Sequence, residues 1–419
     1  MYSISDNRPE VFVIDIDHIN GIQTSRIFAE RGVKVTGIAS NPSHFCARTN
    51  SAKTILKTNT KNEELISTLV NSGRKLTQKA ILVPCQDQSV YLISKYREEL
   101  LPYYQIALPP HKIVDLLMDK PSFYEFARKE KLPVANFFIL NSISDAKDAA
   151  EQINFPAVLK PHMKSVQWAQ NTIEKAFKVF DKKEFFDIYN KTSGWTESLM
   201  IQEWVAGEDT DLYSCNCYFN SNSDPLVSFV AKKLRQFPIE TGNTSLGIDC
   251  IDDNVKNITL DLFRRVNYFG LGYVEIKKDS RTGNYFIIEP NIGRPTGRSA
   301  LAEACGVEIL YTMYSDLTGL PLPDNRKQVY KGIKWIHLRT DLQSSAGYWK
   351  KGKLKFGDWL RSIRGKKYFA VFSLKDPIPF LEELRFGLVY SFKTLLNKFR
   401  QNHGVTESRK YLNQYKKVN

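Results

Sequence analysis

The sequence predicts a protein of mixed α/β and α+β architecture with several domains. Three observations carry this prediction. Residues 11–39 run through an apolar segment, a helical pattern and a second apolar segment, which is the β-α-β order of a parallel sheet. Residues 272–291 hold two β-rich runs around the turn sequence D-S-R-T-G-N, which is typical of a hairpin. Residues 341–419 are strongly basic and contain a helical apolar stripe. A chain of 419 residues can form two to four domains.

The N-terminal region predicts a parallel sheet without a dinucleotide site. Val11 to Ile16 is an apolar strand, a helix follows and ends at Gly32, and residues 80–85 (A-I-L-V-P-C) form a further buried strand. The first turn lacks G-x-G-x-x-G, so dinucleotide binding is not supported. Asp87 follows the strand at 80–85, where open sheets place ligands. We expect it to cap a helix N-terminus, with substrate contact as the alternative.

The hairpin places two acids opposite each other. With the turn centred on Thr282, Glu275 lies opposite Glu289, and Asn291 shares the face of Glu289. Opposed like charges destabilise a sheet unless something offsets them, and Mg2+ favours carboxylate oxygens together with substrate phosphates. Lys277 is expected to point the same way and to neutralise part of the charge. A solvated hairpin face with incidental acids is the alternative.

The segment E-P-N-I-G-R (289–294) resembles the acid-x-Asn-x-Arg signature that closes the ATP site of ATP-grasp ligases. Glu275 lies where that superfamily carries its other metal-binding acid. The resemblance implies ATP and Mg2+ (or Mn2+) as cofactors, with Glu275, Glu289 and Asn291 as metal ligands. Arg294 comes one residue later than in the usual E-x-N-P-R form and is a candidate catalytic residue.

Two lysines fit the same family. The segment D-K-P-S-F-Y-E-F-A-R-K-E-K-L-P resembles a nucleotide element that would place Lys120 at the α-phosphate. The strand F-P-A-V-L-K-P resembles the one that carries the second nucleotide lysine, here Lys160. The family usually continues with a glycine-rich loop over the phosphates. This chain has no glycine from Lys160 to Ser193, so Lys164 and Ser165 would cover the phosphates differently, or the lid would close only with the acceptor bound.

The segment L-M-I-Q-E-W-V-A-G-E-D (199–209) resembles the hinge that holds adenine and ribose. The candidate nucleotide residues of this segment are Gln202, Glu203, Trp204 and Val205 at adenine and Glu208 at ribose. A strand that ends in a glycine turn, with exposed acids, is the alternative.

A basic strand follows the hinge. Lys233 and Arg235 are expected to share one strand face, and the resemblance implies that this face meets the phosphates and the acyl intermediate. Arginine suits that task because its planar fork binds phosphate through two hydrogen bonds.

The resemblance gives the whole domain order. We expect an ATP-grasp fold with a Rossmann-like N-terminal domain (1–107), an N-terminal lobe (108–200), a C-terminal lobe with the metal site (201–328) and a basic helical extension (329–419). The extension resembles the tail of a D-aspartate ligase-like subgroup of predicted carboxylate–amine ligases that is often linked with surface polysaccharide assembly.

The net charge of +14 is concentrated in the extension, where residues 341–419 hold 17 Lys and Arg against 6 Asp and Glu. The main body is therefore nearly neutral, which argues against a protein built around nucleic acid. The last helix carries a stripe of Leu381, Leu384, Leu388, Phe392, Leu395 and Phe399. Peripheral contact with the inner face of the plasma membrane and docking on the protein body are both open for this stripe.

Other features favour the cytoplasm. No apolar stretch is long enough to span a membrane, and the N-terminus has no signal-peptide pattern. The six cysteines form no disulfide framework, and Cys215 and Cys217 are expected to be packed core thiols, with a metal or disulfide role as the less favoured alternative.

The resemblance implies an ATP-dependent ligase that forms an amide from a carboxylate and an amine through an acyl phosphate, in cell-surface polysaccharide or peptidoglycan precursor modification. The oligomeric state stays open, with a homodimer as one candidate because dimers are common among relatives. The alternatives are a nucleotide-binding scaffold without turnover and a biotin-carboxylase-like enzyme. The second would need a separate carrier, since the chain has no A-M-K-M segment.

Overall fold

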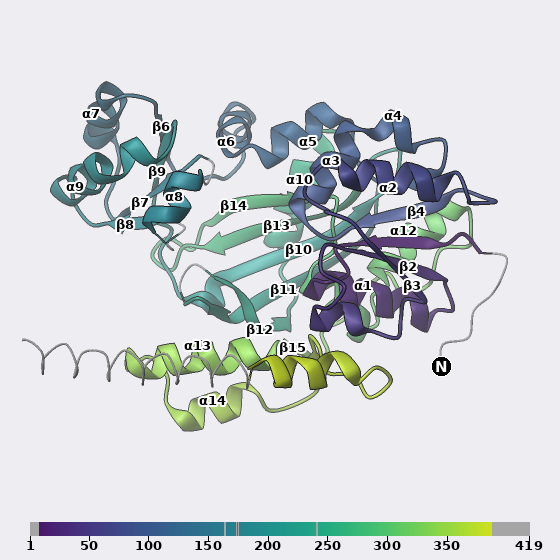
Figure 1. Ribbon diagram of the computed structural model, residues 1–419. Helices are drawn as coiled ribbons and strands as arrows, with labels where there is room; N and C mark the ends of the chain where they lie inside the picture. The colour runs from purple at the N-terminus through teal and green to yellow at the C-terminus, as the bar shows by residue number, and fades with distance from the viewer. Residues whose placement is uncertain (1–7, 163–164, 173, 175, 240–241, 388–419) are drawn as a thin grey trace, which may run out of the picture.

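The computed structural model describes residues 8–162, 165–172, 174, 176–239 and 242–387. These residues contain a five-stranded, a four-stranded and a seven-stranded sheet (Figure 1). No helix within these ranges has the length and apolar character needed to cross a membrane.

The first sheet is parallel throughout and has the strand order β3-β2-β1-β4-β5. The predicted β-α-β pattern is therefore confirmed. The elements of this unit are β1 (Val11–Ile14), α1 (Ile19–Glu30), β2 (Val35–Ala39), β3 (Thr54–Lys57), α2 (Glu64–Gly73), β4 (Ala80–Pro84), α3 (Asp87–Lys95), α4 (Arg97–Leu100) and β5 (Tyr104–Ile106), with a short 3-10 turn at Phe45–Arg48.

The second sheet has the order β6-β9-β7-β8 and forms a small lobe at the left of Figure 1. Its helices α7 and α9 pack on a core that includes Trp168 and Phe185. The elements of the lobe are β6 (Phe137–Leu140), α7 (Ile143–Gln152), β7 (Ala157–Pro161), α8 (Val166–Asn171), β8 (Phe177–Val179), α9 (Lys182–Thr192) and β9 (Leu199–Glu203), with a 3-10 turn at Ser193–Trp195. Two helices precede the lobe in sequence and lie outside it, α5 (His111–Met118), which packs against α3 and β14, and α6 (Lys120–Lys129).

The third sheet has the order β14-β13-β10-β11-β12-β15-β16 and contains the predicted hairpin as β13 and β14. Cys215 and Cys217 are free and buried in β10, as expected of core thiols. Its elements before the extension are a 3-10 turn at Asp209–Asp211, β10 (Leu212–Phe219), β11 (Pro225–Phe237), β12 (Asn243–Asp249), α10 (Asp253–Arg265), β13 (Gly270–Lys278), β14 (Tyr285–Ile292), α11 (Gly297–Ala304) and α12 (Ile309–Thr318).

The C-terminal extension differs from a purely helical appendage, because two of its segments join this sheet. β15 (Lys334–Ile336) pairs antiparallel with β12, and β16 (Lys367–Phe369) pairs parallel with β15. The helices α13 (Leu338–Lys350) and α14 (Phe356–Ser362) lie between the two strands in sequence and form the lower edge of the molecule in Figure 1. Three-residue strands carry too little periodicity to be recognised from sequence.

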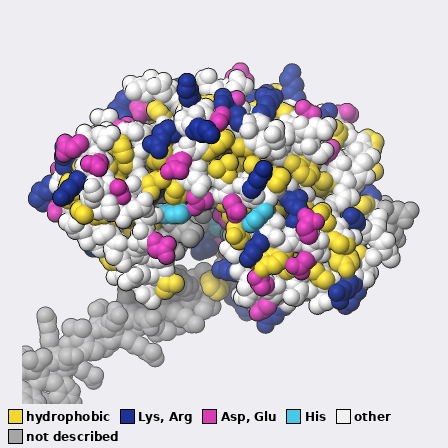
Figure 2. Space-filling view, turned by 90° about the horizontal axis from the view of Figure 1, so that it is seen from above, with side chains coloured by type: hydrophobic (Ala, Val, Ile, Leu, Met, Phe, Trp, Pro, Cys, Tyr) yellow, Lys and Arg dark blue, Asp and Glu magenta, His cyan; other side chains and the backbone are white. Residues whose placement is uncertain are grey.

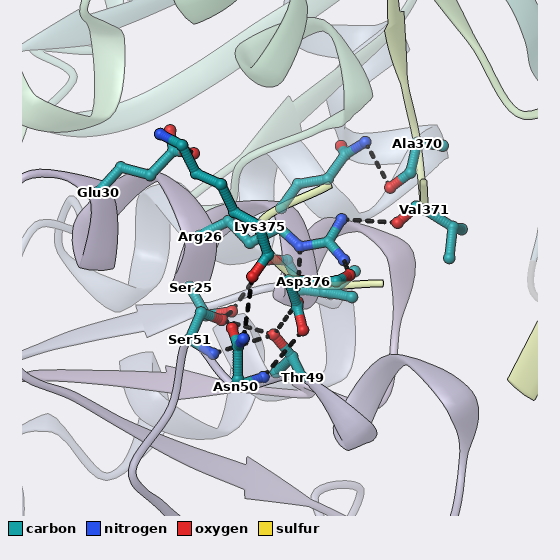
Figure 3. A network of polar contacts seen from close by, with 12 residues as sticks. Ser25, Arg26, Glu30, Thr49, Asn50, Ser51, Ala370, Val371, Lys375 and Asp376 are labelled. Atoms are coloured by element: carbon teal, nitrogen blue, oxygen red, sulfur yellow. Dashed lines mark hydrogen bonds and ion pairs between the residues drawn. The ribbon is translucent and has the colours of Figure 1, made fainter. Parts of the chain in front are cut away.

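A buried polar network joins the extension to the N-terminal domain (Figure 3). We call its residues Arg26, Thr49, Asn50, Val371 and Asp376 the clasp. Arg26 on α1 donates from Nε to Asp376 Oδ2 at 2.9 Å and from Nη1 to the Val371 carbonyl at 2.8 Å. The Asp376 carboxylate also accepts from the Thr49 hydroxyl and from the Asn50 backbone N–H at 3.0 Å. Arg26 and Asp376 are almost completely buried, so each charge depends on the other.

The N-terminal domain also packs closely against the hairpin. Gly293, just after β14, has φ +69°, and a Cβ there would lie 2.3 Å from a methyl group of Leu108. Gly270, at the start of β13, has φ +116° and would place a Cβ 2.1 Å from the Ala107 carbonyl oxygen. Both positions need glycine for conformation and for space. The acidic hairpin is therefore held against the domain at residues 107–108.

The predicted apolar stripe is described only in its first part. Leu381 is 60% exposed and Leu384 is 48% exposed, so these two side chains do not dock on the described body. Phe380 and Glu383, on the same helical segment, face the protein. Leu388, Phe392, Leu395 and Phe399 lie outside the described residues, as do Arg400, Lys393 and Lys398.

Candidate functional site

The two hairpin acids lie opposite each other, as predicted. Glu275 on β13 pairs with Glu289 on β14, and Asn291 pairs with Tyr273. A register shift follows Glu275, so the ladder is irregular directly beside the acidic pair. Such irregularities often re-aim side chains next to functional sites. A hollow opens near the middle of the face shown in Figure 2, with charged and histidine side chains around it.

Two cations reach the Glu275 carboxylate. Lys233 Nζ on β11 lies 3.3 Å from Oε2, and Arg298 Nη2 donates to Oε1 at 3.1 Å. Burial by itself would raise the pKa of Glu275, but Lys233 and Arg298 outweigh it and lower the pKa. Glu275 is therefore held as a carboxylate, the form that a cation requires.

Arg298 was not among the residues selected from the sequence. It lies in the first turn of α11, whose N-cap Thr296 forms a capping box with Ser299. Its guanidinium also donates to Thr244 at 2.9 Å and to Ser214 at 3.3 Å, so it spans three strands of the sheet. The signal was present in R-P-T-G-R-S, because a Thr N-cap places Arg298 at the start of a helix that follows the acidic strand.

Arg294 connects the hairpin with the N-terminal domain. It donates from Nη2 to Asn291 Oδ1 at 2.7 Å and from Nε to the Asp87 carboxylate. The expectation that Asp87 is a helix N-cap is wrong, because Gln86 holds that position and Asp87 is the first residue of α3. The carboxylate is thereby free of capping and pairs with Arg294 across the two domains.

The two candidate nucleotide lysines lie on β7 of the small lobe and at the start of α6. Lys160, on β7, donates to Gln202 Oε1 at 2.9 Å and lies 5.0 Å from the centre of the Tyr124 ring. Burial lowers the pKa of Lys160 to about 8, and Glu289 opposes this shift. Lys120 is the first residue of α6, whose N-cap is Asp119. Its charge adds to the positive end of the helix dipole.

At the hinge, two lysine ammonium groups lie over the ring of Trp204. Trp204 has Lys178 Nζ at 4.2 Å and Lys277 Nζ at 4.8 Å from its ring centre. Lys277 therefore lies at the hinge, whereas the sequence placed its charge at the acidic pair. The Glu203 carboxylate turns away to accept from Asn154, at 2.8 Å and 3.1 Å.

The remaining hinge residues differ in their exposure to solvent. Val205 is buried and Glu208 is exposed. The backbone N–H groups of Glu203 and Trp204 donate to Asn136 and Pro156 at 2.9 Å, so these two N–H groups serve the lobe itself. A base edge at the hinge would therefore have to use other backbone groups of 203–206.

Arg235 is not brought to the acidic pair. Its guanidinium forms a two-point ion pair with the buried Asp341 of α13, at 2.8 and 2.9 Å, and donates to Ser362 at 2.6 Å. Register shifts between Lys233 and Gln236 break the simple alternation that the sequence argument assumed. Lys233 therefore faces Glu275, while Arg235 faces the extension.

The segment expected to be a phosphate lid forms a short helix where it is described. Ser165 caps α8 by accepting from the Trp168 backbone N–H at 2.9 Å, and its hydroxyl contacts the Trp195 carbonyl. Trp168 is fully buried and anchors the segment in the lobe. Lys164 lies outside the described residues.

The donor set at the hairpin suits a hard divalent cation. Glu275, Glu289 and Asn291 bring together two carboxylates and an amide oxygen, the ligand type that Mg2+ prefers. A cation would have to displace the contacts that Lys233 and Arg298 make with Glu275 and that Arg294 makes with the Asn291 oxygen. Within the described ranges no three His, Cys, Asp or Glu side chains cluster as a metal site. The Asn291 Nδ2 atom is buried and has no hydrogen-bond partner, which leaves this side chain incompletely satisfied as it stands.

Comparisons with known proteins agree with these features. No protein-family model matches the chain. It is 24% identical to D-aspartate ligase from Enterococcus faecium over 234 residues, which is 54% of this chain and 55% of that protein. It is 21% identical to D-alanine–D-alanine ligase from Acinetobacter baylyi over 48% of this chain and 68% of that protein. The first match thus spans about half of its relative.

Solved structures share the fold at low sequence identity. N5-carboxyaminoimidazole synthetase from Staphylococcus aureus superposes with a TM-score of 0.60 and 15% identity, over 77% of this chain and 81% of that one. The biotin carboxylase domain of the Hydrogenobacter thermophilus 2-oxoglutarate carboxylase, a dimer in complex with MgADP, gives a TM-score of 0.60 and 13% identity, over 76% and 72%.

Proposed function

The chain has the ATP-grasp fold and resembles ATP-grasp carboxylate–amine ligases, and from this premise we propose that it joins a carboxylate to an amine at the expense of ATP. The opposed Glu275 and Glu289 carry the proposal, because Lys233 and Arg298 contact Glu275 and Arg294 contacts Asn291 on the same hairpin. Glu289 also favours the charged form of Lys160. Two acids among several cations form a site for a metal–nucleotide complex and an anionic substrate.

The proposed reaction has two steps. A carboxylate oxygen attacks the γ-phosphorus of ATP, which releases ADP and yields an acyl phosphate. The amine nitrogen then attacks the acyl carbon, loses a proton, and phosphate leaves with its bonding electron pair. The first step converts a poor leaving group into a good one, so the protein has mainly to position the reactants and to stabilise charge.

We assign one set of site residues to the nucleotide and another to the phosphoryl group that is transferred. Lys120 and Lys160 would hold the α- and β-phosphates, and Gln202, Val205 and Trp204 would border the adenine, with Glu208 at the ribose. Glu275, Glu289 and Asn291 would hold Mg2+ or Mn2+, which would supply positive charge to offset that of the phosphates.

Lys233, Arg294 and Arg298 would stabilise the transferring phosphoryl group and the oxyanion of the second step. Arg298 takes the place that the sequence assigned to Arg235, because it contacts Glu275 and Arg235 does not. In this assignment Arg235 is a positioning residue that fixes β11 against α13.

The amine and carboxylate of cell-envelope precursors, such as amino acids and sugar acids, are the substrates we propose to test first. We place the reaction in the cytoplasm, where ATP is available and the six free thiols stay reduced. A homodimer stays a prediction.

The test measures ADP release from the purified chain with Mg–ATP and a library of amino acids crossed with sugar acids. We expect ADP only when both partners are present, together with a product whose mass is the sum of the two minus one water. ADP release that needs bicarbonate and a biotinyl carrier would instead support carboxylation.

A nucleotide-binding scaffold is the second candidate function. The helix α8, in the segment where relatives were expected to carry a glycine-rich lid, favours it. ATP binding measured by calorimetry, without ADP release under any condition of the library, would establish the scaffold and overturn the ligase.

A further inference from the structure

The helix α13 buries polar side chains and exposes apolar ones, whereas an ordinary surface helix does the opposite. Its buried stripe is polar and consists of Asp341, Ser344, Ser345 and Tyr348. Asp341 pairs with Arg235, and Ser344 donates to the Gln236 carbonyl at 2.7 Å. Leu342 and Trp349, seven residues apart, are 44% and 36% exposed. The polar contacts hold the helix in place, and they leave its apolar side chains outside.

The neighbouring helix α14 extends this apolar surface. Phe356 is 61% exposed and Leu360, one turn later, is 37% exposed. The rings of Trp349, Phe356 and Trp359 contact one another, with centroid separations of 5.6 to 6.2 Å. We call Leu342, Trp349, Phe356 and Leu360 the α13–α14 patch. Several exposed apolar side chains on two helices that contact each other indicate an interaction surface.

The surroundings of the patch are strongly basic. Residues 350–367 hold eight Lys and Arg and a single acid, Asp358, which pairs with Arg361. Lys355, Arg364 and Lys366 are exposed. The segment therefore combines bulky apolar side chains with a net charge of +7, from eight positive charges and one negative.

These features discriminate between occupants. A second copy of the chain would bring two positive surfaces together, which is unfavourable. Nucleic acid would satisfy the cations and stack on rings, but it offers nothing to the aliphatic Leu342 and Leu360. An anionic lipid surface satisfies both parts, because apolar side chains enter the interface and Lys and Arg meet the headgroups.

We propose that the α13–α14 patch binds the surface of an anionic membrane, with Trp349, Phe356 and Leu360 inserted at the headgroup level. The exposed Leu381 and Leu384 lie on the helical segment 378–387, at the same lower edge of the molecule in Figure 1. This inference goes beyond the proposed function and does not depend on it.

The test is flotation of the full chain with vesicles of phosphatidylcholine alone or mixed with phosphatidylglycerol. We expect binding only to the mixed vesicles. The double variant Phe356→Ser/Leu360→Ser should lower the vesicle partition coefficient by about tenfold or more. Phe180→Ser is the matched control, because Phe180 is also 61% exposed but lies on the small lobe.

A charge pair provides the second variant. Lys355→Glu/Lys366→Glu should lower binding by at least about tenfold, since each change reverses a charge near the lipid surface. Lys53→Glu/Lys57→Glu makes the same change on two exposed residues, one just before β3 and one at its end, and should leave binding unchanged.

Three results would overturn the proposal. The first is equal flotation of the Phe356→Ser/Leu360→Ser variant and the Phe180→Ser control, with both folded by circular dichroism. The second is loss of binding on removal of residues 388–419 with no effect of either patch variant, which would assign binding to that segment. The third is retention of double-stranded DNA without binding to vesicles.

Discussion

The clasp and the acidic hairpin both contain carboxylates that contact arginine side chains, but the two sites differ in how completely those carboxylates are paired. In the clasp, the Asp376 carboxylate accepts hydrogen bonds from Arg26, Thr49 and the Asn50 N–H, so the one negative charge is paired with the one positive charge. In the hairpin, Glu275 and Glu289 occupy paired positions of neighbouring strands, and the two cations at Glu275 lie 3.1 and 3.3 Å from its carboxylate. The Asn291 amide nitrogen there is buried without a partner.

The difference separates a structural ion pair from a binding site. A closed network holds one arrangement, whereas an incompletely satisfied one can exchange protein contacts for contacts with a ligand. Removing a residue from the clasp should therefore affect folding, and removing one from the hairpin should affect chemistry.

The largest effect is expected at the clasp. Asp376→Ala leaves the buried Arg26 guanidinium without its carboxylate, and it should lower the free energy of unfolding by about 3–5 kcal/mol. Urea denaturation measures this. Lys375→Ala is the control, because its ion pair with Glu30 is exposed and long at 3.6 Å, and its loss should cost less than about 1 kcal/mol. Equal effects of the two variants would remove the distinction.

The next effect is expected at the hairpin. Glu289→Gln removes one carboxylate of the opposed pair and should lower ADP release by about 10²–10³-fold, with the midpoint of thermal unfolding unchanged or raised by the relief of repulsion. Glu151→Gln, on an exposed surface helix, should leave ADP release unchanged. Near-normal turnover in Glu289→Gln would refute the metal assignment.

A smaller effect should separate Arg298 from other arginines. Arg298→Lys keeps the charge but loses the fork that reaches Glu275, Thr244 and Ser214, and ADP release should fall by about 10–100-fold. Arg326→Lys is a suitable comparison, since the Arg326 guanidinium donates to the backbone carbonyls of Pro323 and Leu226 and not to the hairpin acids. If both variants behave alike, Arg298 has no particular role in the reaction.

The smallest effect concerns pH. Burial lowers the pKa of Lys160 to about 8, so its ammonium is lost as the pH rises through that value. ATP affinity should fall by up to about tenfold between roughly pH 7 and 9, as calorimetry would measure. Lys160→Arg should remove this dependence and Lys160→Ala should weaken binding at every pH.

The sign for stability is opposite. Between about pH 8 and 10.5 the unfolded lysine retains a proton that the folded one has lost, so Lys160 contributes more stability as the pH rises. An affinity of the wild-type protein for ATP that stays constant between roughly pH 7 and 9 would mean that Lys160 does not meet the phosphates.

Sequence reasoning was most successful where local rules suffice. The D-S-R-T-G-N turn and the period of two fix the register of the hairpin, so Glu275 and Glu289 were paired correctly. The parallel N-terminal sheet follows from alternating patterns. The polar clasp, in contrast, joins Arg26 to Asp376 across 350 residues, and no local pattern contains that information.

The sequence prediction failed where a strand is irregular or a side chain depends on tertiary direction. The bulge after Lys233 turned Arg235 toward Asp341, and alternation could not reveal it. Arg298 reaches Glu275 only because α11 starts beside the sheet. Lys277 was placed on the acidic face, but its ammonium lies over Trp204 at the hinge.

The clasp also bears on how the chain is made. Arg26 leaves the ribosome 350 residues before Asp376, which corresponds to about 20–70 s of translation. During that interval α1 can fold against its sheet, but its guanidinium has no counter-charge from the extension. The N-terminal domain therefore reaches its complete set of buried contacts only after the extension has been synthesised.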